Sequence, residues 1–204
     1  IGGTLALNKR SLAFVERGNL FTGDNNSDGG DRARWVYVLP GGDSGWRYGY
    51  QWITRPNLRG PWNEELHWKP HFPGQAAFLV PPVANLADGP SGLAYHPGTG
   101  PLTEWRGHFF LCDFRGNPAI SGVHAFTVEP RGAGFVLGPR EKFLWGALVT
   151  DVDFAPDGAL FVSDWVDAWN KTGKGRLYRV APAAASAGPV DGPVDTPLDT
   201  PLDD

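Results

Sequence analysis

Three strings of one pattern decide the fold: "GNLFTGD" at residues 18–24, "GHFFLCD" at 107–113 and "GALFVSD" at 158–164. Each string runs Gly, any residue, an apolar residue, Phe, two further residues, Asp. The glycine suits a tight turn, and the residues after it have the composition of a short, half-buried strand. A pattern that returns three times predicts one supersecondary unit used three times.

Short alternating segments flank each string. Upstream lie "SLAF" (11–14), "SGLAYHP" (91–97) and "TDVDFAP" (150–156), and downstream lie "RWVYVL" (34–39), "GVHAFTV" (122–128) and "GRLYRV" (175–180). The order strand, glycine turn, strand ending in Asp, long loop, strand is the order within a propeller blade. One small sheet cannot bury both of its faces, so such units stack around an axis and form the core between them.

The sequence therefore predicts an all-β chain, a partial β-propeller of about three four-stranded blades out of six, over residues 1–180. Gly107 and Gly158 are one blade period apart, whereas Gly18 lies much further upstream. The excess falls in residues 54–90, which are rich in Pro and Trp, and we interpret this segment as a long insertion loop over one end of the propeller. Residues 181–204 are expected to form a disordered tail rich in Pro and Asp.

Three blades do not close a ring, because propellers need about four or more. We therefore expect either the remaining blades on the same polypeptide or self-association that covers the open blade faces. The formal charge of −4 and the scattered Lys and Arg residues argue against nucleic acid as a partner. No apolar run approaches the roughly 20 residues of a membrane-spanning helix, and the single cysteine, Cys112, excludes an intrachain disulfide.

The stretch "DNNSDGGD" at residues 24–31 is the candidate metal site. Asp24, Asn26 and Asp28, followed by Gly29, match the D-x-[DN]-x-[DN]-G opening of a calcium loop. The twelfth position of an EF-hand, a bidentate Glu, is a Trp here, so Asp31 is the only later carboxylate in the loop. Asn, Asp and Gly are also ordinary turn formers, and both interpretations remain open.

The aspartates that end the three strings occupy the same place in each predicted blade. We expect Asp113 to cap a turn by accepting backbone N–H groups. Arg115 follows it in "DFRGN", and Lys171 lies in the loop after Asp164. These cations would meet the 24–31 loop at one mouth of the propeller, which suits an anionic ligand beside a metal ion, although exposed charges on loops also need no ligand. The sequence identifies no catalytic residue.

The stretches "GPSGLAYHPGTG" (89–100), "RGHFFLCDFRGN" (106–117) and "TDVDFAPDGALFVSDW" (150–165) are specific in order and wording. Together with residues 18–51, they resemble the C-terminal half of the six-bladed glucose/sorbosone dehydrogenase-like propellers, which are quinoprotein sugar dehydrogenases. The likeness is closest to the planctomycete-type "membrane-bound dehydrogenase" haem-binding proteins. The resemblance implies oxidation of a sugar or alcohol, a calcium ion at the 23–31 loop, and pyrroloquinoline quinone contacted by Arg115 and Lys171. It also implies a c-type haem domain as electron acceptor and a periplasmic or other extracytoplasmic location.

The chain departs from that family at two places. Leu148 and Thr150 stand where those enzymes have arginines that grip the quinone, and the histidine base of those enzymes belongs to earlier blades that this chain lacks. We therefore expect the chain by itself to be inactive. Two alternatives remain, a calcium-dependent, lactonase-like hydrolase and a non-catalytic propeller that binds carbohydrate or protein.

Overall fold

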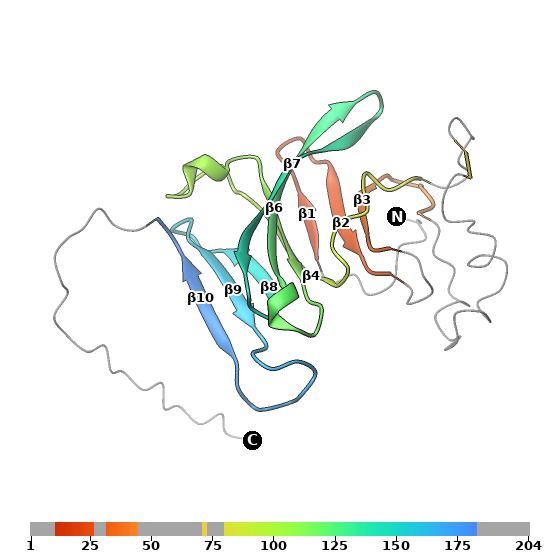
Figure 1. Cartoon of the computed structure of the whole chain (residues 1–204). Helices are drawn as coiled ribbons and strands as arrows, with labels where there is room; N and C mark the ends of the chain where they lie inside the picture. Colours follow the sequence, from red (N-terminus) through yellow and green to blue (C-terminus); the bar gives the residue numbers. More distant parts are fainter. Residues whose placement is uncertain (1–10, 27–31, 45–70, 73–79, 183–204) are drawn as a thin grey trace, which may run out of the picture.

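The computed structural model describes residues 11–26, 32–44, 71–72 and 80–182. This part of the chain is nearly all β, in three antiparallel sheets (Figure 1). Asp28, Asp31, most of the 54–90 segment and the tail beyond residue 182 lie outside the described residues. No helix of the described part is long and apolar enough to cross a membrane.

Each sheet is one blade, and each blade contains one of the repeated strings as its second strand. Blade 1 consists of β1 (Leu12–Phe14), β2 (Leu20–Asp24) and β3 (Arg34–Val38). Blade 2 consists of β4 (Pro90–Tyr95), β5 (Phe109–Asp113), β6 (Gly122–Arg131) and β7 (Gly134–Trp145). Blade 3 consists of β8 (Val149–Phe154), β9 (Leu160–Asp164) and β10 (Arg176–Val180). Two short 3-10 helices, η3 (Thr103–Trp105) and η4 (Pro118–Ile120), lie in loops of blade 2.

The prediction of an all-β partial propeller is confirmed. The glycine that opens each string has a positive φ, 76° at Gly18, 77° at Gly107 and 79° at Gly158. An L-residue with a side chain rarely adopts that conformation, which explains why glycine recurs at this turn. Among the described residues, blade 2 has the four strands predicted for each blade, and blades 1 and 3 have three strands each.

The described end of the 54–90 segment adds to the edge of blade 1. The Trp35 N–H donates to the carbonyl of Ala84 at 2.8 Å, and the Val83 N–H donates to the carbonyl of Trp35 at 2.8 Å. Leu86, two residues further on, is buried. This short pairing occupies the place beside β3 that a fourth strand would take.

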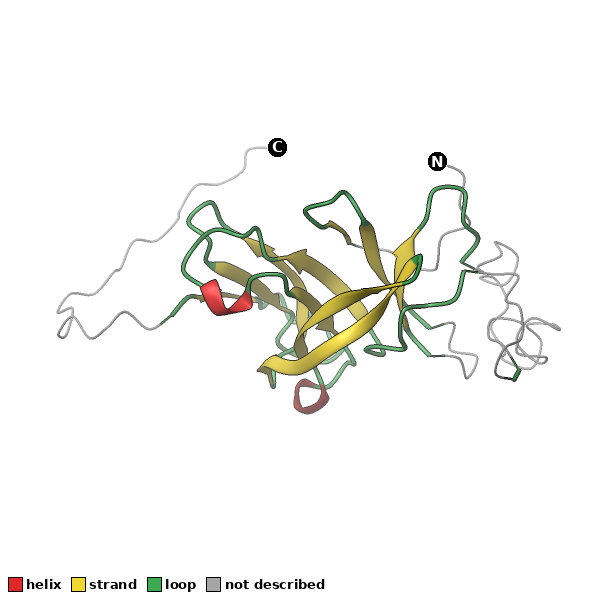
Figure 2. Cartoon of the chain, turned by 90° about the horizontal axis from the view of Figure 1, so that it is seen from above, coloured by secondary structure: helices red, strands yellow, loops and turns green. Residues whose placement is uncertain are grey.

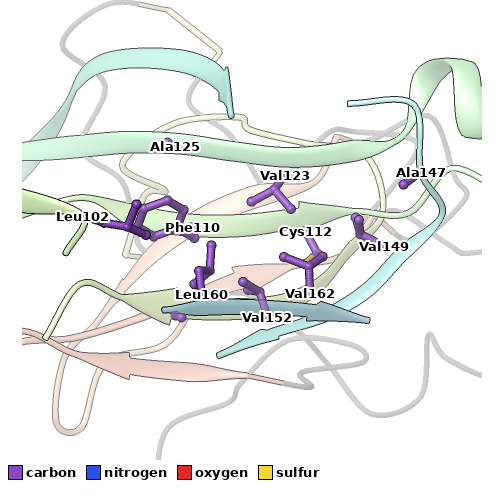
Figure 3. Packing of buried hydrophobic residues seen from close by; sticks show 11 residues of the cluster. Leu102, Phe110, Cys112, Val123, Ala125, Ala147, Val149, Val152, Leu160 and Val162 are labelled. Carbon is purple, nitrogen blue, oxygen red and sulfur yellow. The ribbon is translucent and has the colours of Figure 1, made fainter. Parts of the chain in front are cut away.

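The core consists of two clusters, one in each space between neighbouring blades. The cluster between blades 1 and 2 is rich in aromatic rings, with Phe21, Trp35, Phe109 and Phe126 fully buried. The cluster between blades 2 and 3 is mostly aliphatic, as Figure 3 shows for residues such as Val123, Val152, Leu160 and Val162. Figure 2 shows the strands from above. Strand β4 contacts β1 and β2 of blade 1 and β8 of blade 3.

Candidate functional site

The three repeat-ending aspartates lie at one end of the blades, which we call the aspartate rim. It is defined by Asp24, Asp113 and Asp164, where β2, β5 and β9 end and the third strand of each blade begins. The loops that follow β5 and β9 touch there, since the ring of Trp169 packs edge-on against Phe114 with centroids 4.9 Å apart. The expected meeting of like-numbered loops is therefore confirmed for blades 2 and 3.

Asp113 and Asp164 both cap turns with one carboxylate oxygen. Oδ1 of Asp113 accepts the N–H groups of Asp88 and Gly89 at 3.0 and 2.9 Å, at the entry to β4. Oδ1 of Asp164 accepts the N–H of Leu148 at 3.0 Å and of Val166 at 2.9 Å. Each aspartate thus ties the end of its own strand to the beginning of the first strand of the same blade, which confirms the predicted capping role of Asp113.

Asp24 has a different partner. Its Oδ2 accepts hydrogen bonds from Nε, at 2.8 Å, and from Nη2 of Arg34, and both side chains are buried. Arg34 also donates from Nη1 to the carbonyl of Ser44 at 2.7 Å. A guanidinium that binds a carboxylate in this way is a strong charge-assisted contact, and its positive charge disfavours a cation at the same oxygen.

Register explains this pair, which sequence analysis did not find. Asp24 is paired with Arg34, and Asp164 is paired with Arg176 at the equivalent position of blade 3, where Nη1 lies 3.7 Å from Oδ2. In blade 2 the equivalent residue is Gly122, so Asp113 has no arginine opposite it. An Arg at the first position of the third strand is the signal that could have predicted both contacts.

In blade 2 the positive charge beside Asp113 comes from Arg115, because the cross-strand partner of Asp113 is Gly122. Its Nη2 forms an ion pair with Asp88, and its Nε lies 3.6 Å from Oδ2 of Asp113. The Arg115 N–H donates to Oγ of Ser121 at 3.0 Å, which holds the loop between β5 and η4 in place. Arg115 is therefore positioned at the rim with two carboxylates beside it.

Lys171 lies on the loop after β9, where it is exposed. This loop contains Val166 and Ala168 at φ values of 79° and 36°, although neither is glycine. Backbone strain of this kind persists only where the surroundings enforce it, and it clusters at functional sites. Trp169 of the same loop fixes it against Phe114. The structure thus brings the loops that contain Arg115 and Lys171 together through the contact of Phe114 with Trp169.

The expected calcium ligands are described only in part. Asp24 is engaged by Arg34, and the Asn26 N–H donates to Oδ1 of Asn25 at 3.0 Å. Asp28 and Asp31 lie outside the described residues. Within residues 11–26, 32–44, 71–72 and 80–182, no group of three or more His, Cys, Asp or Glu side chains is arranged to hold a metal ion.

The two residues that replace the family's arginines have structural roles here. Leu148 is fully buried against blade 3, and Thr150 shares a hydrogen bond of 2.9 Å with the Ser163 hydroxyl. Cys112 is buried between blades 2 and 3, and burial raises the pKa of its thiol above the ordinary value. The protonated thiol is not a candidate nucleophile.

Known structures share this fold. The chain is similar to a putative oxidoreductase (glucose dehydrogenase) from Thermus thermophilus, with 20% identity and a TM-score of 0.55 over 84% of this chain and 43% of that one. It is similar to the soluble aldose sugar dehydrogenase of Escherichia coli in its apo form, with 18% identity, a TM-score of 0.55, and 86% and 45% coverage. The PQQ-bound aldose sugar dehydrogenase of Streptomyces coelicolor matches with 19% identity, a TM-score of 0.54, and 87% and 44% coverage.

The chain spans less than half the length of each of these dehydrogenases. No family model matches the chain, and no curated protein matches its sequence. At this level of identity the similarity shows a common fold. The fold is that of part of a β-propeller, as the sequence predicted, and the solved structures that share it are sugar dehydrogenases.

Proposed function

We propose that this chain forms about half of a quinoprotein-type sugar or alcohol dehydrogenase propeller and is inactive without the other blades. The observation that supports this most strongly is the fold, which matches 84 to 87% of the chain to sugar dehydrogenases, one of them a PQQ-bound form. The proposed ligand face is the aspartate rim, because charged side chains and strained backbone gather there.

In this proposal Arg115 and Lys171 contact an anionic cofactor or substrate, and Asp24, Asn26, Asp28 and Asp31 form the calcium cradle. The fit of the described residues to these groups is incomplete. Arg115 already has two carboxylate neighbours, and Arg34 already occupies Oδ2 of Asp24. The described residues therefore make neither a complete quinone site nor a complete calcium site, and we assign the remaining contacts to the other blades.

The open faces of the end blades support a need for further blades or for a second copy. Leu12 and Phe14 of β1 are 53% and 65% exposed, while Ala13 between them is buried. Leu177 of β10 is 67% exposed. A c-type haem domain as electron acceptor and an extracytoplasmic location are part of the same proposal and rest on the sequence resemblance.

Titration of a complete propeller that contains this chain, with pyrroloquinoline quinone and calcium, tests the cofactor assignment. We expect the quinone spectrum to change and the melting midpoint to rise, because a ligand that binds only the folded state stabilises it. Lys171→Ala should weaken the effect, whereas Arg131→Ala, a change at the distant β6–β7 turn, should not. An unchanged spectrum and midpoint would reject the quinone, and the fold assignment would stand.

Calcium has a separate test. Melting with calcium and with chelator should show a higher midpoint in calcium, and Asp28→Ala should abolish the difference. Asp153→Ala, which removes an exposed carboxylate of β8, is the matched control. If calcium protects the Asp28→Ala variant as well as the parent, Asp28 does not belong to the site.

A non-catalytic propeller is the second candidate, favoured by the buried Leu148 and the hydrogen-bonded Thr150. Neither residue can offer a charge to a quinone. Sugar binding that persists in chelator, with no quinone-dependent dye reduction after the missing blades are supplied, would support this candidate over the dehydrogenase.

A further inference from the structure

A pocket of about 410 Å³ opens between blades 1 and 2 at the aspartate rim. Its walls come from four separate parts of the chain: the segment before β3, the segment before β4, the β5–β6 loop, and the strands β6 and β7. The cationic residues of its lining are Arg32, Arg115, Arg140 and Lys142. Its volume lies in the range of about 300 to 1,000 Å³ that is usual for small-molecule sites.

Positive charge dominates this pocket. The two lining carboxylates, Asp88 and Asp113, both have Arg115 as a neighbour. Arg32 and Arg140 form no ion pair within the described part of the chain, and the Lys142 ammonium lies 4.3 Å from the centroid of the Trp145 ring. Three cations therefore face one cavity with no carboxylate of the described residues bound to them, and an anion would relieve their mutual repulsion.

A buried histidine adds a second, independent signal. His124 lines the pocket, is 8% exposed, and has Nε2 at 3.5 Å from Oδ2 of Asp113. Its Nδ1 is buried without a hydrogen-bond partner among the described residues. Buried ring nitrogens almost always have partners, so a ligand hydroxyl that reaches this side of the ring would satisfy a nitrogen that the described residues leave unpaired. A hydroxyl group satisfies either tautomer, because it can donate or accept.

From these observations we propose that the pocket between blades 1 and 2 binds a small polyhydroxylated carboxylate, such as a sugar acid. Arg32, Arg140 and Lys142 bind the carboxylate, and His124 contacts a hydroxyl. The groups proposed to bind this ligand are Arg32, Arg140, Lys142 and His124, none of which belongs to the proposed cofactor site, although Arg115 lines the pocket as well. It is lined by the outer strands β6 and β7 of blade 2 and is complete within two blades, whereas the proposed cofactor site requires the missing ones.

Calorimetric titration of the whole chain with glucuronate tests the proposal. Glucose matches the probe in its ring and hydroxyls but lacks the charge, and inorganic phosphate has the charge but lacks the ring. We expect glucuronate to bind at least tenfold more tightly than either. The double variant Arg140→Glu with Lys142→Glu should lower the affinity for glucuronate at least tenfold, and both residues are exposed, so the fold should tolerate the change.

The matched control is Arg131→Glu with Lys174→Glu, which changes net charge equally at exposed positions that do not line the pocket. This variant should keep the parent affinity. His124→Gln, which retains hydrogen-bonding groups, should bind better than His124→Phe. Equal binding of glucose and glucuronate, equal binding of phosphate and glucuronate, equal loss in the control variant, or no binding of glucuronate would each overturn the proposal.

Discussion

The two interfaces between blades bury apolar surface in different ways. Between blades 1 and 2, rings stack and meet edge to face: Phe109 lies 5.2 Å from Phe21, 4.9 Å from Trp35 and 5.6 Å from Phe126, measured between centroids. Between blades 2 and 3, branched aliphatic side chains interdigitate, as in Figure 3. The same repeated strand pattern therefore supports two kinds of packing.

The two interfaces also differ in how closely the main chains of neighbouring blades approach each other. At the interface of blades 2 and 3, a Cβ on Gly92 would lie 2.5 Å from Cα of Asp151, and a Cβ on Gly100 would lie 2.5 Å from Cα of Gly158. At the interface of blades 1 and 2, a Cβ on Gly23 would instead meet the side chain of Pro90. Glycine thus allows direct contact of main chains between blades 2 and 3.

Two pockets lined by described residues lie at the aromatic interface, one at each end. The rim pocket measures about 410 Å³, and the pocket at the glycine-turn end, lined by residues such as Tyr37, Tyr95 and Phe135, measures about 470 Å³. The comparison teaches that two interfaces built from the same repeated strands can differ in the kind of side chain that they bury and in the pockets beside them.

The largest change in the free energy of unfolding is expected from a substitution that disrupts the aromatic interface. Phe109→Ala should lower the free energy of unfolding by about 4 kcal/mol, since it removes a buried ring and leaves a cavity among its neighbours. Val162→Ala, at the aliphatic interface, should cost about 2 kcal/mol, because less buried volume is lost. Urea unfolding followed by circular dichroism measures both. Equal losses would show that the two interfaces do not differ energetically.

A second change tests the close backbone contact. Gly92→Ala should destabilise the chain by about 3 kcal/mol, because the new methyl group meets Cα of Asp151 and main chain must move. Gly23→Ala should cost about 1 to 2 kcal/mol, since side chains of blade 2 can yield in part. Gly134→Ala, with nothing within 4 Å of the added Cβ, is the control. A Gly92 variant as stable as the control would contradict the tight interface.

Much of this fold could be predicted from the sequence, because the three strings place the turn glycine, the buried Phe and the terminal Asp at the same spacing in each blade. The strand β7 could not be predicted in this way. Residues 134–145 have no counterpart in the other repeats and include Pro139, which breaks strand patterns but is tolerated at an irregular edge. The pairing of Ala84 with Trp35 depends on a long-range contact that no local pattern encodes.

The candidate site was only partly predictable. The capping role of Asp113 follows from turn chemistry, which is local. The partner of Asp24 is Arg34, which depends on strand register. The rim pocket collects Arg32, Arg115 and Arg140 from positions far apart in the chain, so only the stacking of blades 1 and 2 brings them together.

A smaller change in the free energy of unfolding is expected from removing an aspartate side chain that caps a turn at the rim. Asp164→Ala should cost about 2 kcal/mol, because the N–H groups of Leu148 and Val166 lose their acceptor beside the aliphatic interface. Asp153→Ala removes an exposed carboxylate that accepts only the Phe154 N–H and should change the free energy of unfolding much less. Chemical denaturation of both variants checks the order, and a reversed order would mean that Asp164 does not stabilise the blade.

The smallest expected effect is a pH dependence at the interface of blades 2 and 3. Burial lowers the pKa of His96, whose Nδ1 accepts the Gly98 N–H at 3.0 Å and whose ring packs on Phe154. In the unfolded chain this histidine binds a proton below a pH of about 6.5, whereas in the folded chain it stays neutral to lower pH. The unfolded state then holds more protons, so the free energy of unfolding falls as pH drops below about 6.5.

His96→Gln removes this titration while an amide oxygen can still accept the Gly98 N–H. Denaturation of the parent and the variant at pH 8.0 and 5.5 should therefore show a smaller loss of stability on acidification in His96→Gln. An unchanged pH dependence in His96→Gln would mean that the acid sensitivity arises from another titratable group.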